Sequence, residues 1–205
     1  MKKKGSFMMT IGLLLLAAAL VLTGYNIWES KQAEKFSNAA LEEIMLHIEQ
    51  NNAQEDTSQE MEVPDYVLFP DKEMPVVLVD GQYYVGAVQI PELDMTLPIL
   101  AGEWSYAKLQ KAPCCYTGSI YKDNMVVAGH NYWSHFSPIK SLGVGSEICF
   151  IDVEGNVFNY TVGWVDILQP TDVEKLTDNK DWDLTLFTCT YDGRERYTVR
   201  CIREN

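Results

Sequence analysis

Hydrophobic and polar positions divide the chain into segments of different character. Residues 5–28 carry no charged side chain, and at about 1.5 Å per residue such a helix can cross the roughly 30 Å hydrocarbon core of a bilayer. Residues 29–62 begin with an apolar stripe at helical spacing and then become rich in Asn, Gln, Glu and Ser. The stripe consists of Leu41, Ile44, Met45 and Ile48. We therefore expect a transmembrane helix followed by a juxtamembrane helix and polar linker, with the stripe open to self-association or to docking on the rest of the chain.

The remaining residues, 63–205, have the pattern of a β protein. Prolines interrupt short apolar runs rich in Val, Ile and Tyr, which favours short strands and loops over long helices. About eight strand candidates follow in order: VVLV, YYVGAVQI, MTLPIL, NMVVAG, EICFIDV, NVFNYTVGWVDIL, LTLFTC and RYTVRCI. A hairpin is predicted to turn at Glu154, Gly155 and Asn156, and residues 169–182 are predicted to form a loop with one helical turn. The strand count predicts an all-β barrel with short helical turns.

Charge on either side of the apolar segment predicts its orientation. Residues 1–4 include three lysines, whereas Glu29 and Lys31 follow the segment. Since basic residues favour the cytoplasmic side, we expect a single-pass anchor in the cell membrane, with the N-terminus in the cytoplasm and the rest outside. The alternative is a cleaved signal peptide, because four leucines are followed by three alanines. The apolar run continues through Leu22, which is longer than a signal peptide needs and favours a retained anchor.

Composition restricts the partners of the part that follows the membrane segment. Three of the 16 basic residues precede that segment, so 13 remain against all 29 acidic residues, an excess of 16 negative charges. Such a surface makes nucleic acid an unsuitable partner. No spacing resembles an EF-hand loop, and we predict neither a metal nor another cofactor. The five cysteines leave the disulfide state open, and an odd number fits one free reactive thiol.

The C-terminal part of the chain contains the ingredients of thiol chemistry. Cys189 ends the apolar run LTLFTC, His130 lies in NMVVAGHN, and Arg196 begins the alternating run RYTVRC. A cysteine attacks a carbonyl as thiolate and needs a base such as histidine, and a guanidinium can hold the negative oxygen that results. Arg194 and Arg200 share the strand face of Arg196 by parity, so periodicity alone leaves the choice among the three open.

Two of these segments resemble a known family. The segment TLFTC resembles the TLxTC signature of the sortases, cysteine transpeptidases that attach proteins to the cell wall of Gram-positive bacteria, and NMVVAGHN resembles the block around their catalytic histidine. The resemblance covers about residues 76–202 and implies a sortase-like eight-stranded barrel in a catalytic domain formed by residues 63–205. It assigns Cys189 as nucleophile, His130 as acid and base, and Arg196 as the catalytic arginine.

The resemblance also implies partners. We expect surface proteins bearing a sorting signal as substrates, and an amine of a peptidoglycan precursor or a pilin as acceptor. Thr185, Phe187 and Asn131 are the candidate substrate-binding residues, although Thr185 and Phe187 would equally suit packing of the barrel. The sorting motif, the acceptor and the subfamily are left open.

Two other functions remain open at this point. The first keeps the thiol but uses water as acceptor, which gives a cysteine peptidase. The second is a non-catalytic surface module with zinc bound by Cys114, Cys115, His130 and His135. The spacing of the two histidines suits zinc, but adjacent cysteines do not suit the usual chelating separation.

Overall fold

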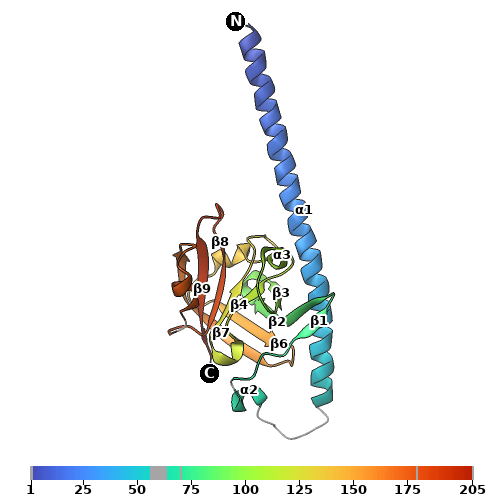
Figure 1. The fold of residues 1–205 in the computed structure, drawn as a ribbon, viewed down its shortest axis with the longest axis vertical. Coiled ribbons are helices and arrows are strands. Elements are labelled where there is room, and N and C mark those ends of the chain that lie inside the picture. The colour runs from blue at the N-terminus through green and yellow to red at the C-terminus, as the bar shows by residue number, and fades with distance from the viewer. Residues whose placement is uncertain (1, 56–63, 70, 179, 205) are drawn as a thin grey trace.

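The computed structural model of the chain describes residues 2–55, 64–69, 71–178 and 180–204. It consists of a β-barrel packed against one long N-terminal helix (Figure 1). The α-helices are α1 (Lys2–Glu55), α2 (Asp65–Leu68), α3 (Tyr106–Leu109) and α4 (Val173–Thr177). The strands are β1 (Val77–Val79), β2 (Gln82–Ile90), β3 (Met95–Leu100), β4 (Cys114–Thr117), β5 (Met125–Ala128), β6 (Glu147–Asp152), β7 (Val157–Leu168), β8 (Leu184–Cys189) and β9 (Arg196–Arg203). Short 3-10 helices are η1 (Pro91–Leu93), η2 (Ile120–Lys122) and η3 (Ser137–Ser141).

Helix α1 joins the two helices predicted from the sequence into one. It continues without interruption through residue 28, where the apolar segment ends, and the described residues 7–28 are all exposed. By length and composition it is the candidate membrane span among the described residues. Figure 1 shows its N-terminal half projecting beyond the barrel. Of the predicted polar linker, residues 56–62 lie outside the described residues.

The C-terminal half of α1 docks on the barrel. Ala33, Ala40, Ile44 and Ile48 are buried, at the spacing of one helix face. Ala40, Ile44 and Ile48 form an apolar cluster with residues of β1, β2, β3 and the start of β4. Of the two roles left open for the predicted stripe, docking on the rest of the chain is the one observed.

Eight strands close into a barrel, which confirms the predicted architecture. The order is β2-β3-β4-β5-β8-β9-β7-β6, and β6 pairs back onto β2 through Gly86↔Asp152 to Gln89↔Cys149. Strand β1 lies outside this ring and pairs with the first residues of β2. One edge of β2 therefore serves β1 and then β6, and the change occurs at Gly86. Its φ is +150°, and an added Cβ would lie 2.1 Å from the Ile151 carbonyl oxygen, so glycine is required there.

The membership of the barrel differs from the prediction in one strand. All eight predicted strands are present, but the first of them is β1, outside the ring. The eighth barrel strand is β4, a four-residue strand that the sequence analysis missed. Its segment CCYT lies between Pro113 and Gly118 and is too short to display a period. The predicted hairpin between β6 and β7 and the predicted helical turn, α4, are both present.

Alternation along the strands gives the barrel an inner and an outer apolar cluster. Leu184, Leu186 and Val199 face the inner core. Phe187 faces outward, where it packs in a second cluster with Val126, Ala128, Leu168 and Leu176. The outer face of β5, β8 and β9 is thus partly covered, and this face leads to the candidate site.

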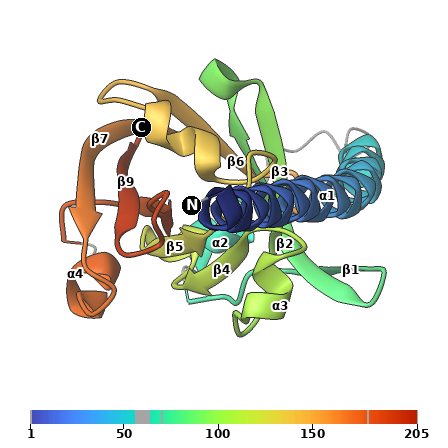
Figure 2. The same ribbon diagram turned by 90° about the horizontal axis from the view of Figure 1, so that it is seen from above.

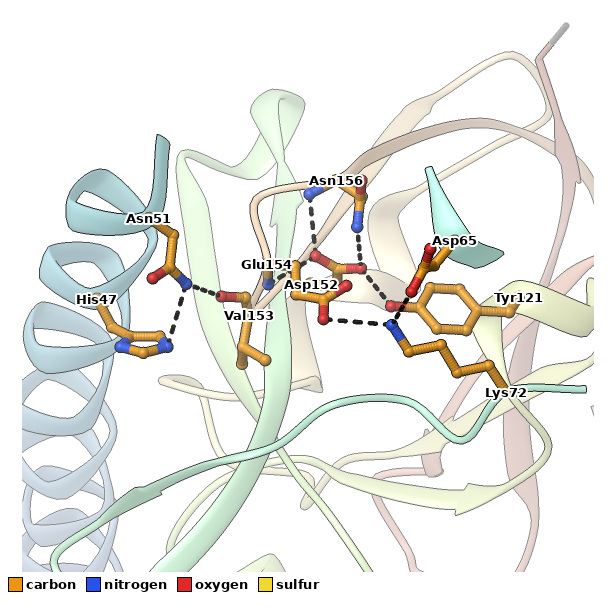
Figure 3. A network of polar contacts seen from close by, with 9 residues as sticks. All are labelled: His47, Asn51, Asp65, Lys72, Tyr121, Asp152, Val153, Glu154 and Asn156. Atoms are coloured by element: carbon orange, nitrogen blue, oxygen red, sulfur yellow. Dashed lines mark hydrogen bonds and ion pairs between the residues drawn. The ribbon is translucent and has the colours of Figure 1, made fainter. Parts of the chain in front are cut away.

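The buried carboxylate of Asp152 accepts hydrogen bonds at the end of the barrel remote from that site (Figure 3). Asp152, with no exposed surface, accepts hydrogen bonds from the Tyr121 hydroxyl at 2.7 Å, the Asn156 side chain at 2.8 Å, and the backbone N–H groups of Glu154 and Asn156, both at 2.9 Å. The Asn51 amide of α1 donates to the Val153 carbonyl of the same turn at 3.2 Å. The β6–β7 turn therefore links the barrel to α1.

We expect Asp152→Ala to lower the free energy of unfolding by about 2–4 kcal/mol, because it leaves several buried donors without an acceptor. Glu154→Ala is the matched control. Its carboxylate is half-exposed and pairs with Lys72 at 3.5 Å, so the expected loss is below about 1 kcal/mol. Urea denaturation of the detergent-solubilised chain measures both. Equal losses for the two variants would contradict the importance of the buried carboxylate.

Candidate active site

Strand register brings the three predicted catalytic residues to one end of the barrel. Strands β5 and β8 are parallel, with Ala128 opposite Phe187 and the Gly129 N–H donating to the Phe187 carbonyl at 2.9 Å. His130 follows Ala128 by two residues and Cys189 follows Phe187 by two, so both emerge at the same edge. Arg196 opens β9 directly opposite Cys189 in the antiparallel pair. His130 and Cys189, 59 positions apart in the chain, are thereby brought to the same edge of the sheet by parallel pairing.

The three side chains line one cavity of about 1180 Å³. Its walls come from the outer face of β5 and β8, from the loops after β5, β7 and β8, and from α1. The α1 residues include Thr23, Asn26, Ile27 and Glu29. In the view from above, the N-terminal part of α1 projects toward the viewer, out of the barrel (Figure 2). A helix whose first half is the candidate membrane span therefore forms part of the wall of the candidate site.

The imidazole of His130 is held between two tyrosines. It stacks on Tyr132 with ring centroids 3.8 Å apart and an interplanar angle of 17°. Its Nε2 lies 3.3 Å from the Tyr106 hydroxyl, and its Nδ1 is buried with no hydrogen-bond partner among the described residues. Burial lowers the pKa of His130, and the charge of Glu29 on α1 opposes this only in part. His130 is therefore neutral at pH 7 and able to accept a proton.

Cys189 is partly exposed at the cavity and is free, as are the other four cysteines. Cys114 and Cys201 are buried, and burial raises the pKa of the Cys114 thiol to about 12. Cys115 is also shifted by burial, its pKa being raised to about 11. Burial raises the pKa of Cys201 as well. The thiols of Cys114, Cys115 and Cys201 therefore stay protonated at neutral pH. Among them and Cys189, it is Cys189 that faces the cavity.

Arg196 is the one of the three candidate arginines that lines the cavity. Its Nη1 donates to the carbonyls of Glu195 at 3.1 Å and Gly193 at 3.4 Å. Arg194 is 86% exposed in its side chain and pairs with Asp192 at 3.8 Å.

Arg200 has a different surrounding from its two neighbours. It is buried and donates to the Lys175 carbonyl at 2.6 Å and the Leu176 carbonyl at 2.9 Å, which fastens α4 to the barrel. Its side chain has no place in the cavity wall. The three arginines predicted to share one strand face therefore differ in burial: Arg194 is exposed, Arg196 lines the cavity and Arg200 is buried.

The predicted substrate-binding residues lie in different surroundings. Phe187 and Asn131 line the cavity. Thr185 lies on the same strand face as Phe187, but it is buried and its hydroxyl accepts a hydrogen bond from Arg200 at 3.2 Å, beneath α4 rather than in the cavity wall. A substrate-binding role for these three residues stays a prediction.

One residue beside the site was missed by the sequence analysis. Lys140 in η3 contacts the Asn131 side-chain oxygen, and its Nζ lies 3.8 Å from the centroid of Tyr191. The Asn131 amide in turn donates to the Thr190 carbonyl, next to Cys189, at 3.3 Å. Lys140 and Asn131 thus hold the loop that follows Cys189. The segment SPIKS carries no pattern that would reveal this contact.

The zinc alternative receives no geometric support. Among the residues that the structure describes, no group of three or more His, Cys, Asp or Glu side chains is arranged to hold a metal ion.

His135 lies near the site and provides a pH-dependent contribution to stability. Burial, with the charge of His130 adding to it, lowers its pKa to about 4 from 6.5. Below pH 6.5 the His135 side chain is protonated in the unfolded chain, whereas in the folded chain it stays neutral down to about pH 4. The free energy of unfolding should therefore fall by about 3 kcal/mol as pH decreases across this window. Above pH 6.5 the full stabilising contribution of His135 is present.

Urea denaturation of the detergent-solubilised chain at a series of pH values measures this fall. The matched control is His135→Gln, which should lack this part of the pH dependence. An identical slope in the native chain and in His135→Gln would contradict the assignment to His135.

Comparison with known proteins identifies the family. The family model described as the sortase domain matches residues 88–204, more than half of the chain. The chain belongs to the sortase family. Sortases are known as cysteine transpeptidases, so the family supplies the coarse reaction class of this barrel.

Individual relatives support the same family. Sortase A of Bacillus anthracis is 26% identical over 196 residues, covering 92% of this chain and 90% of the relative. A Clostridium perfringens sortase D5 transpeptidase structure has a TM-score of 0.56 at 21% identity, covering 78% of this chain and 98% of that one. A Clostridium perfringens sortase C, solved with the C-terminal cell wall sorting motif, has a TM-score of 0.52 at 23% identity, covering 81% and 90%. At these identities the two structures show the fold alone.

Proposed function

We propose that this sortase is a membrane-anchored transpeptidase that cleaves a sorting-signal peptide through a thioester on Cys189 and transfers the acyl group to an amine. The observation that carries the proposal is the shared cavity of Cys189, His130 and Arg196. An amine of a peptidoglycan precursor or of a pilin is the proposed acceptor. The sorting motif in the sortase C structure supports a peptide substrate of this kind.

The first half-reaction forms the thioester. The Cys189 sulfur, its proton transferred to His130, attacks the scissile carbonyl carbon, and the negative oxygen of the tetrahedral intermediate is stabilised by Arg196. The carbon–nitrogen bond then breaks, and His130 gives its proton to the leaving amine. The lowered pKa of His130 suits this cycle, because a neutral imidazole accepts a proton and its imidazolium readily returns it.

The second half-reaction releases the acyl group. The acceptor amine attacks the thioester carbonyl and transfers a proton to His130, and Arg196 again stabilises the negative oxygen. The carbon–sulfur bond breaks, and the proton held by His130 returns to the sulfur of Cys189. An amide replaces the thioester, and the three side chains regain their initial protonation states.

We place the protein in the cell membrane with its barrel outside. Two features support this location: the exposed apolar half of α1, and the basic residues that precede it. Retention of the segment is supported by its continuity with the part of α1 that packs on the barrel, because one helix contains both.

The test uses the full chain in lipid nanodiscs and a library of fluorogenic peptides. With an added amine such as triglycine, we expect mass spectrometry to detect both the cleaved peptide and its amide with the amine. Cleavage that gives only the free acid at every amine concentration would instead establish a cysteine peptidase with water as acceptor. Cleavage that persists in Cys189→Ala would overturn the thioester mechanism itself.

A further inference from the structure

We propose that the rim of the catalytic cavity docks on the bilayer, so that the partner of this face is the phospholipid surface itself. The proposal depends on the membrane anchoring given above and extends it from α1 to the barrel. Anchoring alone places α1 across the bilayer but does not say which face of the barrel contacts the headgroups. The position and the chemistry of the rim specify one orientation.

The height of the cavity along α1 is the first argument. A hydrocarbon core of about 30 Å takes up roughly 20 residues of helix, so an anchor that begins at Phe7 reaches the interface near Asn26. Thr23, Asn26 and Ile27 line the same cavity as Cys189. The cavity therefore opens at the level where α1 leaves the hydrocarbon core, not at a distance from it.

The side chains around this opening are the second argument. Tyr191 and Trp133 are 78% and 76% exposed, the two highest values among the large hydrophobic side chains of the described residues. Tyr106 and Trp104, also on the cavity wall, are 64% and 47% exposed. Exposed aromatic rings in such number are costly in water, whereas Trp and Tyr are the residues preferred at the membrane–water interface.

Aromatic residues of the anchor lie at the same level. Trp28 and Tyr25 of α1 are 57% and 54% exposed, and their rings contact each other at 6.0 Å between centroids. Together with the four aromatic residues of the rim they make a belt around the point where the helix meets the interface. On the barrel side, the Tyr191 ring is fixed in place by the Lys140 ammonium beneath it.

Charge indicates how the contact is made. The chain beyond the anchor has an excess of 16 acidic residues, so attraction to anionic lipids cannot be the main contribution. Insertion of aromatic rings among headgroups does not require a basic surface. Docking should therefore occur on zwitterionic phosphatidylcholine, and substrates would reach Cys189 along the membrane surface.

The five tryptophans of the chain allow a direct test. Trp28 reports the anchor, Trp104 and Trp133 report the rim, and Trp164 and Trp182 are controls. Trp164 is 55% exposed on the barrel and pairs with Arg200 between β7 and β9. Arg200 lies four residues along β9 from Arg196 at the cavity, which places Trp164 about 13 Å from that end of the strand. Trp182 precedes β8, whose six residues place it more than about 15 Å from Cys189.

Each tryptophan is kept alone in turn, with the other four replaced by phenylalanine, in full chain reconstituted into phosphatidylcholine nanodiscs. Half of the samples contain lipid brominated high on the acyl chain, which quenches only fluorophores in contact with it. We expect emission of Trp104 and Trp133 to fall roughly twofold, in the range of Trp28, and that of Trp164 and Trp182 to stay unchanged. In the otherwise native chain, Trp133→Phe should lower the quenched share of the total emission, whereas Trp164→Phe should raise it.

The outcomes separate the two proposals. Quenching of Trp28 without quenching of Trp104 and Trp133 would overturn docking while leaving the anchor intact, and would assign the exposed rings to the substrate. Absence of quenching at Trp28 would overturn the anchor. Equal quenching at all five positions would mean that the barrel lies on the membrane in no defined orientation, which also contradicts docking by the rim.

Discussion

Replacement of Cys189 by alanine should abolish acyl transfer, with kcat/KM for a cleaved peptide falling by about 10⁴-fold or more. The reason is that the thioester cannot form, and the positioned His130 and Arg196 alone provide only a small residual acceleration. Intact-protein mass spectrometry supplies a second measurement. The native chain incubated with peptide should gain the mass of one acyl group, and Cys189→Ala should gain none.

Cys149→Ala is the matched control for this loss. Cys149 is a partly buried thiol on β6, where it pairs with Gln89 at the closure of the barrel, and it does not line the cavity. Its replacement should leave turnover and acyl-enzyme formation unchanged. A variant Cys189→Ala that unfolds like the native chain and still turns over peptide would exclude Cys189 as the nucleophile.

The second large effect concerns the arginine. Arg196→Ala should lower kcat by about 10²–10³-fold, because it removes the charged donor proposed for the tetrahedral oxyanion. KM should change less, since the negative oxygen exists only after attack. Arg196→Lys should recover only part of the rate, because a single ammonium cannot reproduce the planar donor geometry of a guanidinium.

Arg194 provides a control two residues away. Its side chain is 86% exposed and does not line the cavity, although its partner Asp192 does, so Arg194→Ala should retain native kcat and KM. Equal losses in Arg194→Ala and Arg196→Ala would contradict the assignment. Arg200 is unsuitable for this comparison, because it is buried and its removal would free α4.

Much of the fold could be predicted because its elements are periodic. The apolar stripe of α1 and the alternation in β2, β6, β7, β8 and β9 are long enough to show their period. Strand β4 was not predicted, because four residues are too few to establish a period. The continuity of α1 through residue 28 was not predicted either, since composition changes there while the helical backbone does not.

The candidate site was predictable in part for a different reason. Cys189 and His130 lie in short motifs that resemble a family, so their proximity could be expected without any knowledge of strand register. The choice of Arg196 over Arg200 depended on the resemblance, because parity places both on one face; in the structure the two differ in that Arg200 is buried under α4. Lys140 and the contribution of α1 to the cavity depend on contacts between segments remote in sequence, which no local pattern encodes.

The uninterrupted helix α1 has a mechanical consequence under the proposed anchoring. An apolar segment that is longer than the surrounding bilayer is thick adapts by tilting, and a shorter one thins the bilayer around it. Because the same rigid rod that would tilt is packed on the barrel through Ala33 to Ile48, its angle would turn the mouth of the cavity toward or away from the headgroups. Lipid chain length would then change the turnover rate through the tilt of a helix that contributes no catalytic group.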